Sequence, residues 1–315
     1  MVLSDDGFAP FDSLLAASDY TTSPWLNGIY QASTDLLQKL VSIPISQGDK
    51  QETGRTAKAF DSWIAHELRR AGFPADSVFP RMSRPRVLAE GLGPLEAKIE
   101  SLGAALEAAE ADGTQLKPRE LRRAIRSVTG HQLGSSSAYI LGDFYAKQVD
   151  VGLSAWDRGP DILISTKTMF SAYGKNLKNR HEEAVGEISS LRRRHPMAAM
   201  GYAYLVRSDI LQNSNAYAAL YDILYRLRRA RETFDATLLL VAEWDEDDLG
   251  AGVRLIDEPA PELGASRFFE DIVRAVMERS PNRVHQEARR RFGDMPVGGL
   301  SEDDEEIGSL DGDDE

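Results

Sequence analysis

Polar residues able to bind a metal ion and a phosphate lie in two consecutive strand-like runs. Asp150 is in the first run, residues 149–155, and Ser165 and Lys167 are in the second, residues 161–168. Aspartate oxygens are ligands that Mg²⁺ prefers, and a lysine beside the metal can position a water molecule and neutralise charge. Together these groups suit the hydrolysis of a phosphodiester.

A charged helix is expected after the second run, and it supplies further carboxylates. Fourteen residues separate Lys167 from Glu182, and fifteen separate it from Glu183; Glu187 lies further along. At 100° per residue, Glu182 and Glu183 flank opposite sides of the expected buried stripe, so only one can face the strands. We take that stripe to be Leu177, Val185, Ile188 and Leu191.

Asp161 is an alternative to Asp150, because it follows Pro160. It precedes Lys167 by six residues on the same strand, which is about 20 Å of extended chain. It could not easily share a metal with groups beside Lys167, so we favour Asp150.

Asp150 on one strand and Ser165-Thr166-Lys167 on the next resemble the site of the PD-(D/E)xK nuclease superfamily. In that family an Asp near the start of one strand and (D/E)xK on the next form the site. The serine is a departure that resembles the restriction-enzyme subgroup with Ser-x-Lys, in which a Glu on the following helix supplies the missing carboxylate. The resemblance covers about residues 120–245. It implies an α/β, restriction-endonuclease-like core with a mixed central sheet flanked by helices.

The resemblance also implies a function, a Mg²⁺-dependent DNA endonuclease of type II-like restriction or anti-phage defence. Asp150 and either Glu182 or Glu183 would bind the metal, Lys167 would orient the attacking water, and Ser165 would mark the vacated carboxylate position. Double-stranded DNA would be the partner, and a homodimer is expected because double-strand cleavage needs two sites. The alternative is a catalytically inactive DNA-binding or protein-interaction module on the same core.

Basic side chains near this helix are candidates for contacts with DNA phosphates. Lys175, Lys178 and Arg180 are at its start, and Arg192 and Arg193 are at its end. The alternative for each is an ordinary solvated helix surface.

The order of the elements predicts how these groups are positioned. We expect a flexible start (1–20), a mostly helical region (21–117), the nuclease-like core (118–292) and an acidic disordered tail (293–315). In the helical region, apolar spacing predicts helices at 25–41 and 56–71, and either one long helix or a helical hairpin broken near 91–94 at 87–111. A basic helix follows at 118–128. In the core, strand-like runs at 139–145, 149–155 and 161–168 suggest a three-stranded meander. Helices and strands then alternate, as in α/β proteins.

The composition limits the alternatives. The 315 residues include no cysteine, which excludes disulfides and thiolate chemistry, and the N-terminus does not have the pattern of a secretory signal. The lack of cysteine also fits a reducing compartment, so a cytoplasmic protein is expected. The chain has no run of about 18 apolar residues, so no membrane span is expected. The net charge is −13, but residues 301–315 hold nine acidic residues and no basic ones. The remaining chain is nearly balanced, so local basic patches decide whether DNA binds.

Overall fold

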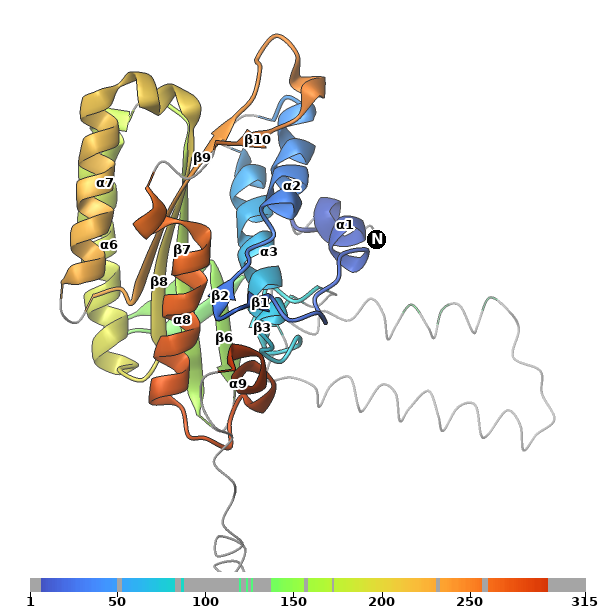
Figure 1. Cartoon of the computed structure of the whole chain (residues 1–315), viewed down its shortest axis with the longest axis vertical. Coiled ribbons are helices and arrows are strands. Elements are labelled where there is room, and N and C mark those ends of the chain that lie inside the picture. Colours follow the sequence, from blue (N-terminus) through green and yellow to red (C-terminus); the bar gives the residue numbers. More distant parts are fainter. Residues whose placement is uncertain are drawn as a thin grey trace, which may run out of the picture.

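The computed structural model describes residues 7–49, 53–82, 86–87, 119, 123, 126, 137–155, 158–171, 173–230, 233–256 and 260–293. They form an α/β fold in which helices cover both faces of a six-stranded mixed sheet (Figure 1). The predicted α/β class, with a mixed central sheet flanked by helices, is therefore confirmed. Residues 88–111 of the helix or helical hairpin predicted at 87–111, most of the helix predicted at 118–128 and residues 294–315 of the acidic tail lie outside the described residues.

Seven α-helices are present in the described part of the chain. They are α1 (Asp12–Ala16), α2 (Thr34–Ser46), α3 (Arg55–Arg70), α6 (Tyr173–Arg194), α7 (Ser214–Arg229), α8 (Ala265–Arg279) and α9 (Gln286–Phe292). Short 3₁₀ turns lie at Ala9–Phe11, Ser208–Gln212, Leu249–Ala251 and Pro261–Leu263. Asn213 is the N-cap of α7, and its side chain accepts a hydrogen bond from the Ala216 backbone N–H (3.2 Å). Asparagine is one of the residues favoured at this position.

The central sheet has the strand order β10-β9-β8-β7-β6-β3. Its strands are β3 (Val78–Phe79), β6 (Val151–Ala155), β7 (Gly159–Met169), β8 (Ala199–Arg207), β9 (Ala236–Glu243) and β10 (Arg254–Leu255). Strands β7, β8 and β9 are parallel, and the other pairs are antiparallel. The parallel strands are apolar along almost their whole length because helices bury both of their faces.

The predicted three-stranded meander is wrong in one strand. Strand β4 (Ala138–Leu141) pairs with β5 (Ala146–Val149) in a separate two-stranded sheet. The place beside β6 is taken by β3, whose two residues are too few to give a periodic signal in the sequence. The β6–β7 hairpin forms as expected, with Val151 opposite Ile164.

The helix predicted for residues 25–41 begins only at Thr34. Two short strands, β1 (Trp25–Leu26) and β2 (Ile29–Tyr30), precede it and pair with each other. The residues between them, Asn27 and Gly28, have φ angles of 53° and 75°. An Asn-Gly pair favours a two-residue hairpin turn with positive φ at both positions. Here the turn chemistry prevails over the helical spacing of the apolar residues.

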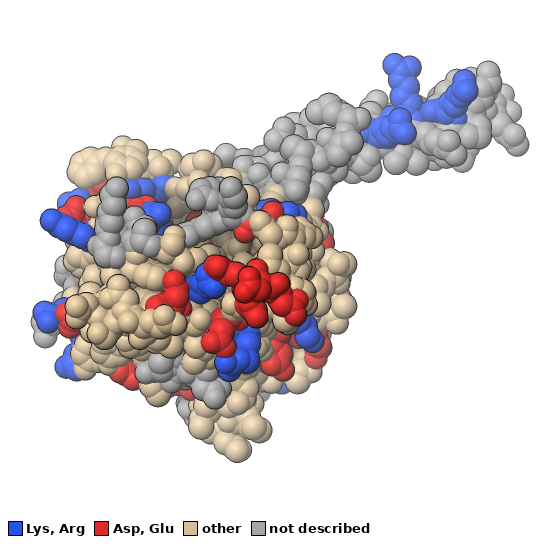
Figure 2. Space-filling view, turned by 90° about the horizontal axis from the view of Figure 1, so that it is seen from above, with Lys and Arg blue, Asp and Glu red and all other residues tan. Residues whose placement is uncertain are grey.

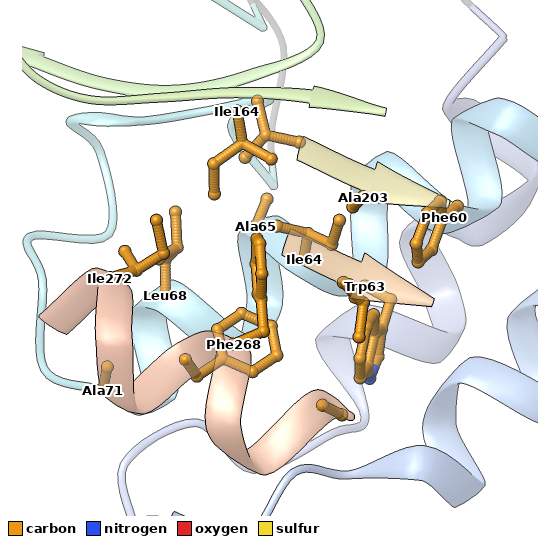
Figure 3. Close-up of a cluster of buried hydrophobic side chains, with 14 of the residues drawn as sticks. Phe60, Trp63, Ile64, Ala65, Leu68, Ala71, Ile164, Ala203, Phe268 and Ile272 are labelled. Atoms are coloured by element: carbon orange, nitrogen blue, oxygen red, sulfur yellow. The ribbon is translucent and has the colours of Figure 1, made fainter. Parts of the chain in front are cut away.

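Apolar side chains form one core on each face of the sheet. One core lies between the sheet and α2, α3 and α8, and the other lies between the sheet and α6 and α7. Alternate residues of β7 enter different cores: Ile162 and Ile164 the first, Leu163 the second. Figure 3 shows the first core, where Trp63 and Ile64 from α3 lie near Phe268 from α8.

The first core crosses the domain boundary that the sequence suggested at residue 118. Helices α2 and α3, from the predicted helical region, bury their apolar faces against β7, β8 and β9. Strand β3, from the same region, is hydrogen-bonded into the central sheet. The N-terminal helices therefore form one layer of the α/β fold, and this brings α3 close to the candidate site.

Two arginines of the basic run 289–291 are built into helix ends. Arg289 is only 8% exposed, and its guanidinium donates to the carbonyl of Met277 in the last turn of α8 and to those of Ser280 and Pro281 just after it. Arg291 donates to the Arg70 carbonyl at the end of α3 (2.6 Å). These cations satisfy carbonyls that lack partners within their helices.

Replacing Arg289 with alanine should lower the free energy of unfolding by about 2–3 kcal/mol, because several buried carbonyls would lose a charged donor. Arg290, one position along, has a 69% exposed side chain paired with Glu287. Arg290→Ala is the matched control and should change stability by less than about 0.5 kcal/mol. Urea unfolding followed by circular dichroism measures both, and equal losses would exclude a special role for Arg289.

Candidate active site

The structure brings Asp150, Ser165 and Lys167 together. Asp150 lies in the bend between β5 and β6, and the antiparallel register places it beside Ser165 on β7. Its carboxylate accepts hydrogen bonds from the Thr166 backbone N–H (2.8 Å) and from the Ser165 hydroxyl (3.3 Å). The two strands thus hold the carboxylate in a defined orientation.

Lys167 completes a hydrogen-bonded series along β7. Its Nζ donates to Ser165 Oγ over 3.0 Å, while the Ser165 hydroxyl donates to Asp150. Ser165 and Lys167 are two residues apart on one strand, so their side chains leave the same face of the sheet. That face is covered by α6, which carries the candidate helix carboxylates.

Helix α6 presents Glu187 to the sheet, and it turns Glu182 away. Ala184 is fully buried while Val185 is 40% exposed, which moves the buried stripe from its predicted place. Measured from Ala184 at 100° per residue, Glu187 lies about 60° away, Glu183 about 100° and Glu182 about 160°. Glu187 and Ser165 line the same small cavity between α6 and β7.

In this geometry Glu187 lines a cavity with Ser165, whereas the predicted Glu182 and Glu183 lie further from the face of α6 that covers the strands. The Glu182 side chain is 66% exposed and lies 4.0 Å from Lys178 Nζ. Glu183 accepts a hydrogen bond from Arg180 over 2.7 Å at the surface. The sequence does contain Glu187, but choosing it depends on whether Ala184 or Val185 faces the core.

The charges of Asp150 and Lys167 shift the pKa values of carboxylates on α6. Burial raises the pKa of Glu187; the Lys167 charge opposes the rise and the Asp150 charge adds to it. For Glu183, burial is outweighed by the hydrogen bond from Arg180 and the charge of Lys167, and its pKa is lowered. The half-buried Glu187 is therefore the helix carboxylate whose ionisation is linked to Asp150.

Asp61 on α3 is a carboxylate of this neighbourhood that sequence reasoning missed. It is 2% exposed, accepts a 2.6 Å hydrogen bond from the Thr166 hydroxyl and lies 3.6 Å from Lys58 Nζ. Burial, and then the charge of Asp150, raise its pKa to about 7. The available signal was a charged residue on the apolar face of a helix, three residues before Ile64.

Thr166 connects the two aspartates. Its backbone N–H donates to Asp150 within the sheet, and its hydroxyl donates to Asp61 on α3. Asp61 therefore positions the strand segment that in turn positions Asp150.

The basic residues predicted to contact DNA have different surroundings. Lys178 is 83% exposed, and Arg180 and Arg193 are also at the surface, paired with Glu183 and Asp143. Arg192 instead donates to the carbonyls of Ala198 and Thr233 and to the carboxylate of Asp235. Arg192 thus has a role in the fold, whatever contact it makes with DNA. The side chain of Lys175 lies outside the described residues.

Asp161, the alternative to Asp150, is engaged elsewhere. Its carboxylate lies 2.9 Å from Arg158 Nε and 3.3 Å from His285 Nε2. It has no hydrogen bond to Ser165 or Lys167 among the described contacts.

Acidic side chains gather at the end of the molecule to which β9 leads (Figure 2). The segment 243–248 contains five carboxylates in six residues. Arg207 pairs with Glu246 and Arg254 pairs with Glu243, so the carboxylates still outnumber these cations. A phosphate backbone would be repelled from this end.

Within the described ranges, no group of three or more acidic, histidine or cysteine side chains is arranged as a metal-binding cluster. None of the described helices has the length and apolar character needed to cross a membrane. No protein-family model, no curated protein and no solved structure matches the chain. The geometry of the site is therefore the basis for any functional assignment.

Proposed function

We propose that this protein is a Mg²⁺-dependent DNA endonuclease of the restriction or anti-phage defence type, built on a restriction-endonuclease-like core. The observation that carries the proposal is the hydrogen-bonded series from Lys167 through Ser165 to Asp150, with Glu187 beside it. It provides a cation and two carboxylates around one point of β7. Glu187 takes the role that the sequence resemblance gave to Glu182 or Glu183.

The donor set fits Mg²⁺. Asp150 and Glu187 are neighbouring carboxylates whose mutual repulsion contributes to the raised pKa of Glu187, and a bound cation would relieve this repulsion. Two carboxylates are enough, because Mg²⁺ usually keeps several waters and takes its other ligands from substrate phosphates. When bound, Mg²⁺ would lower the pKa of a coordinated water and neutralise charge on the phosphate.

The residues of the chain supply the positioning. The Thr166 backbone N–H fixes the Asp150 carboxylate, and Ser165 holds Lys167 next to it. The Lys167 ammonium group would orient the attacking water and balance the negative charge that develops on the phosphate. Ser165 thus links the metal ligand to the lysine at the position where the family has a carboxylate.

A second candidate is a catalytically inactive DNA-binding or protein-interaction module on the same fold. It is favoured by the absence of a three-ligand metal cluster among the described residues. It is also favoured by the internal partners that Ser165 and Lys167 already have.

Incubation of the purified protein with supercoiled plasmid separates the two candidates. We expect nicked and linear DNA to form with Mg²⁺ and no product with EDTA. DNA binding without cleavage in either Mg²⁺ or Mn²⁺ would support the inactive module. Absence of both binding and cleavage would contradict a role in DNA processing.

Replacing Glu187 with glutamine should slow plasmid cleavage at least about a hundredfold. Mutating a residue that only hydrogen-bonds to a metal ligand costs about 10–100-fold in activity, and loss of the ligand itself should cost at least as much. Glu182→Gln is the matched control on the same helix and should cleave at the wild-type rate. The initial rate of nicking at saturating Mg²⁺ measures both. Equal rates for the two variants would remove Glu187 from the site.

A further inference from the structure

The β4–β5 hairpin exposes an unusual set of large apolar side chains. Phe144 is 78% exposed, Tyr139 61%, Tyr145 59% and Leu141 50%. They come from seven consecutive positions that end five residues before Asp150. An exposed apolar patch of this kind commonly marks an interaction site.

The turn of this hairpin is held in place although its aromatic rings are not buried. The Asp143 backbone N–H donates to Ser190 Oγ (3.0 Å), and the Leu141 carbonyl lies 2.8 Å from His195 Nε2. Asp143 also pairs with Arg193 over 2.7 Å. Because α6 fixes the turn, the rings are presented to solvent in a preorganised arrangement, and binding would lose little conformational entropy.

A cation accompanies each ring of the turn. Lys147 Nζ lies 4.7 Å from the centre of the Tyr145 ring, and the Arg193 guanidinium lies 5.7 Å from that of Phe144. Aromatic rings that stack on bases, with cations that meet the backbone, are the usual equipment for binding single-stranded nucleic acid. The segment 243–248, at the end of β9, instead carries five carboxylates in six residues, so a phosphate backbone is disfavoured there.

The hairpin leads directly into the candidate site. Strand β5 ends at Val149, and Asp150 follows it. From Tyr145 to Asp150 the chain spans at most about 17 Å. Lys147 is also close enough to the site for its charge to act on Glu187. A strand whose phosphate reached Asp150 would therefore have neighbouring bases within reach of the hairpin rings.

We infer that Phe144 and Tyr145 stack on unpaired bases beside the scissile phosphate. The preferred substrate is then DNA with a single-stranded segment next to a duplex. This inference rests on the proposed nuclease function, and it narrows the class of substrate.

The test measures binding of fluorescent oligonucleotides in EDTA, where no cleavage interferes. Wild-type protein should bind a duplex with a single-stranded overhang at least about tenfold more tightly than a blunt duplex, and Phe144→Ala/Tyr145→Ala should lose this preference. Leu26→Ala/Ile29→Ala, in the exposed β1–β2 hairpin, is the matched control and should keep it. Because the phosphate contacts remain, the aromatic variant should keep the salt dependence of blunt-duplex binding.

Plasmid cleavage in Mg²⁺ and sedimentation velocity complete the design. If the wild type cleaves plasmid and the aromatic variant keeps the overhang preference, the inference is overturned while the nuclease function stands. If the wild type does not cleave but the preference is lost in the aromatic variant alone, the hairpin inference stands and the nuclease proposal fails. A wild-type dimer that becomes monomeric in the aromatic variant would show that the hairpin binds a second copy, and this would also overturn the inference.

Discussion

Asp150→Asn and Lys167→Met should each reduce Mg²⁺-dependent plasmid cleavage about a thousandfold or more. Metal-based charge stabilisation is worth several kcal/mol, and each 1.36 kcal/mol changes a rate about tenfold. Asparagine can still accept the hydrogen bond from the Thr166 N–H, so Asp150→Asn removes charge and leaves the geometry of the hairpin in place. The measured quantity is the initial rate of nicking at saturating Mg²⁺.

Matched surface variants separate this effect from general loss of charge. Asp222 is exposed on α7, where it pairs with Arg226, and Lys39 is exposed on α2. Asp222→Asn and Lys39→Met should cleave like the wild type. Urea unfolding should give each of the four variants a free energy of unfolding within about 1 kcal/mol of the wild-type value. A folded Asp150→Asn variant with near-wild-type activity would exclude Asp150 as a metal ligand.

The central part of the site could be predicted because it is local in sequence. Asp150 and Ser165 belong to one hairpin, and antiparallel pairing fixes which residues are opposite one another. Ser165 and Lys167 share a face because side chains alternate along a strand. These relations need no knowledge of the rest of the molecule.

Glu187 and Asp61 depend on tertiary packing, and sequence reasoning missed them for that reason. Small and β-branched apolar residues are adjacent at Ala184 and Val185, and only the packed structure shows that Ala184 is buried. Burial of Ala184 sets the rotation of α6 about its axis, and in this rotation Glu187, rather than Glu182 or Glu183, faces the strands. Asp61 is 105 residues from Thr166 in the chain, so no local pattern could pair them.

The fold was predictable to a similar degree. The amphipathic α3 carries a strong helical spacing and lies close to residues 56–71, where the sequence placed it. The buried strands β8 and β9 are continuous apolar runs, and they alternate with helices as the sequence predicted. The helix expected from residue 25 failed because Asn27-Gly28 forms a turn, which is itself a local signal. The separate pairing of β4 with β5 was not predictable, because the sequence of a four-residue strand does not specify which strand it pairs with.

Asp61 should make the protein less stable as the pH rises from about 4 to about 7. Its pKa is raised from the ordinary 3.8 to about 7, by burial and then by the Asp150 charge, with Lys58 and Thr166 opposing the rise. Between these values the folded protein holds a proton on Asp61 that the unfolded chain has lost. Stability therefore falls by at most about 1.4 kcal/mol per pH unit in this window. Below pH 4 the Asp61 carboxyl is protonated in both the folded and the unfolded state. Above pH 7 it is ionised in both, and the full loss of stability caused by its buried charge is present.

Asp61→Asn should remove this dependence, because asparagine can accept the Thr166 hydrogen bond without carrying a charge. Relative to wild type, the variant should gain stability steadily from pH 4 to pH 7 and then keep a constant advantage up to pH 9. Urea unfolding in EDTA at each pH measures the difference, with the exposed Asp222→Asn as the matched control that should follow the wild type. A stability difference between Asp61→Asn and wild type that does not change with pH would show that Asp61 is ionised throughout this range, held by Lys58 rather than neutralised by burial.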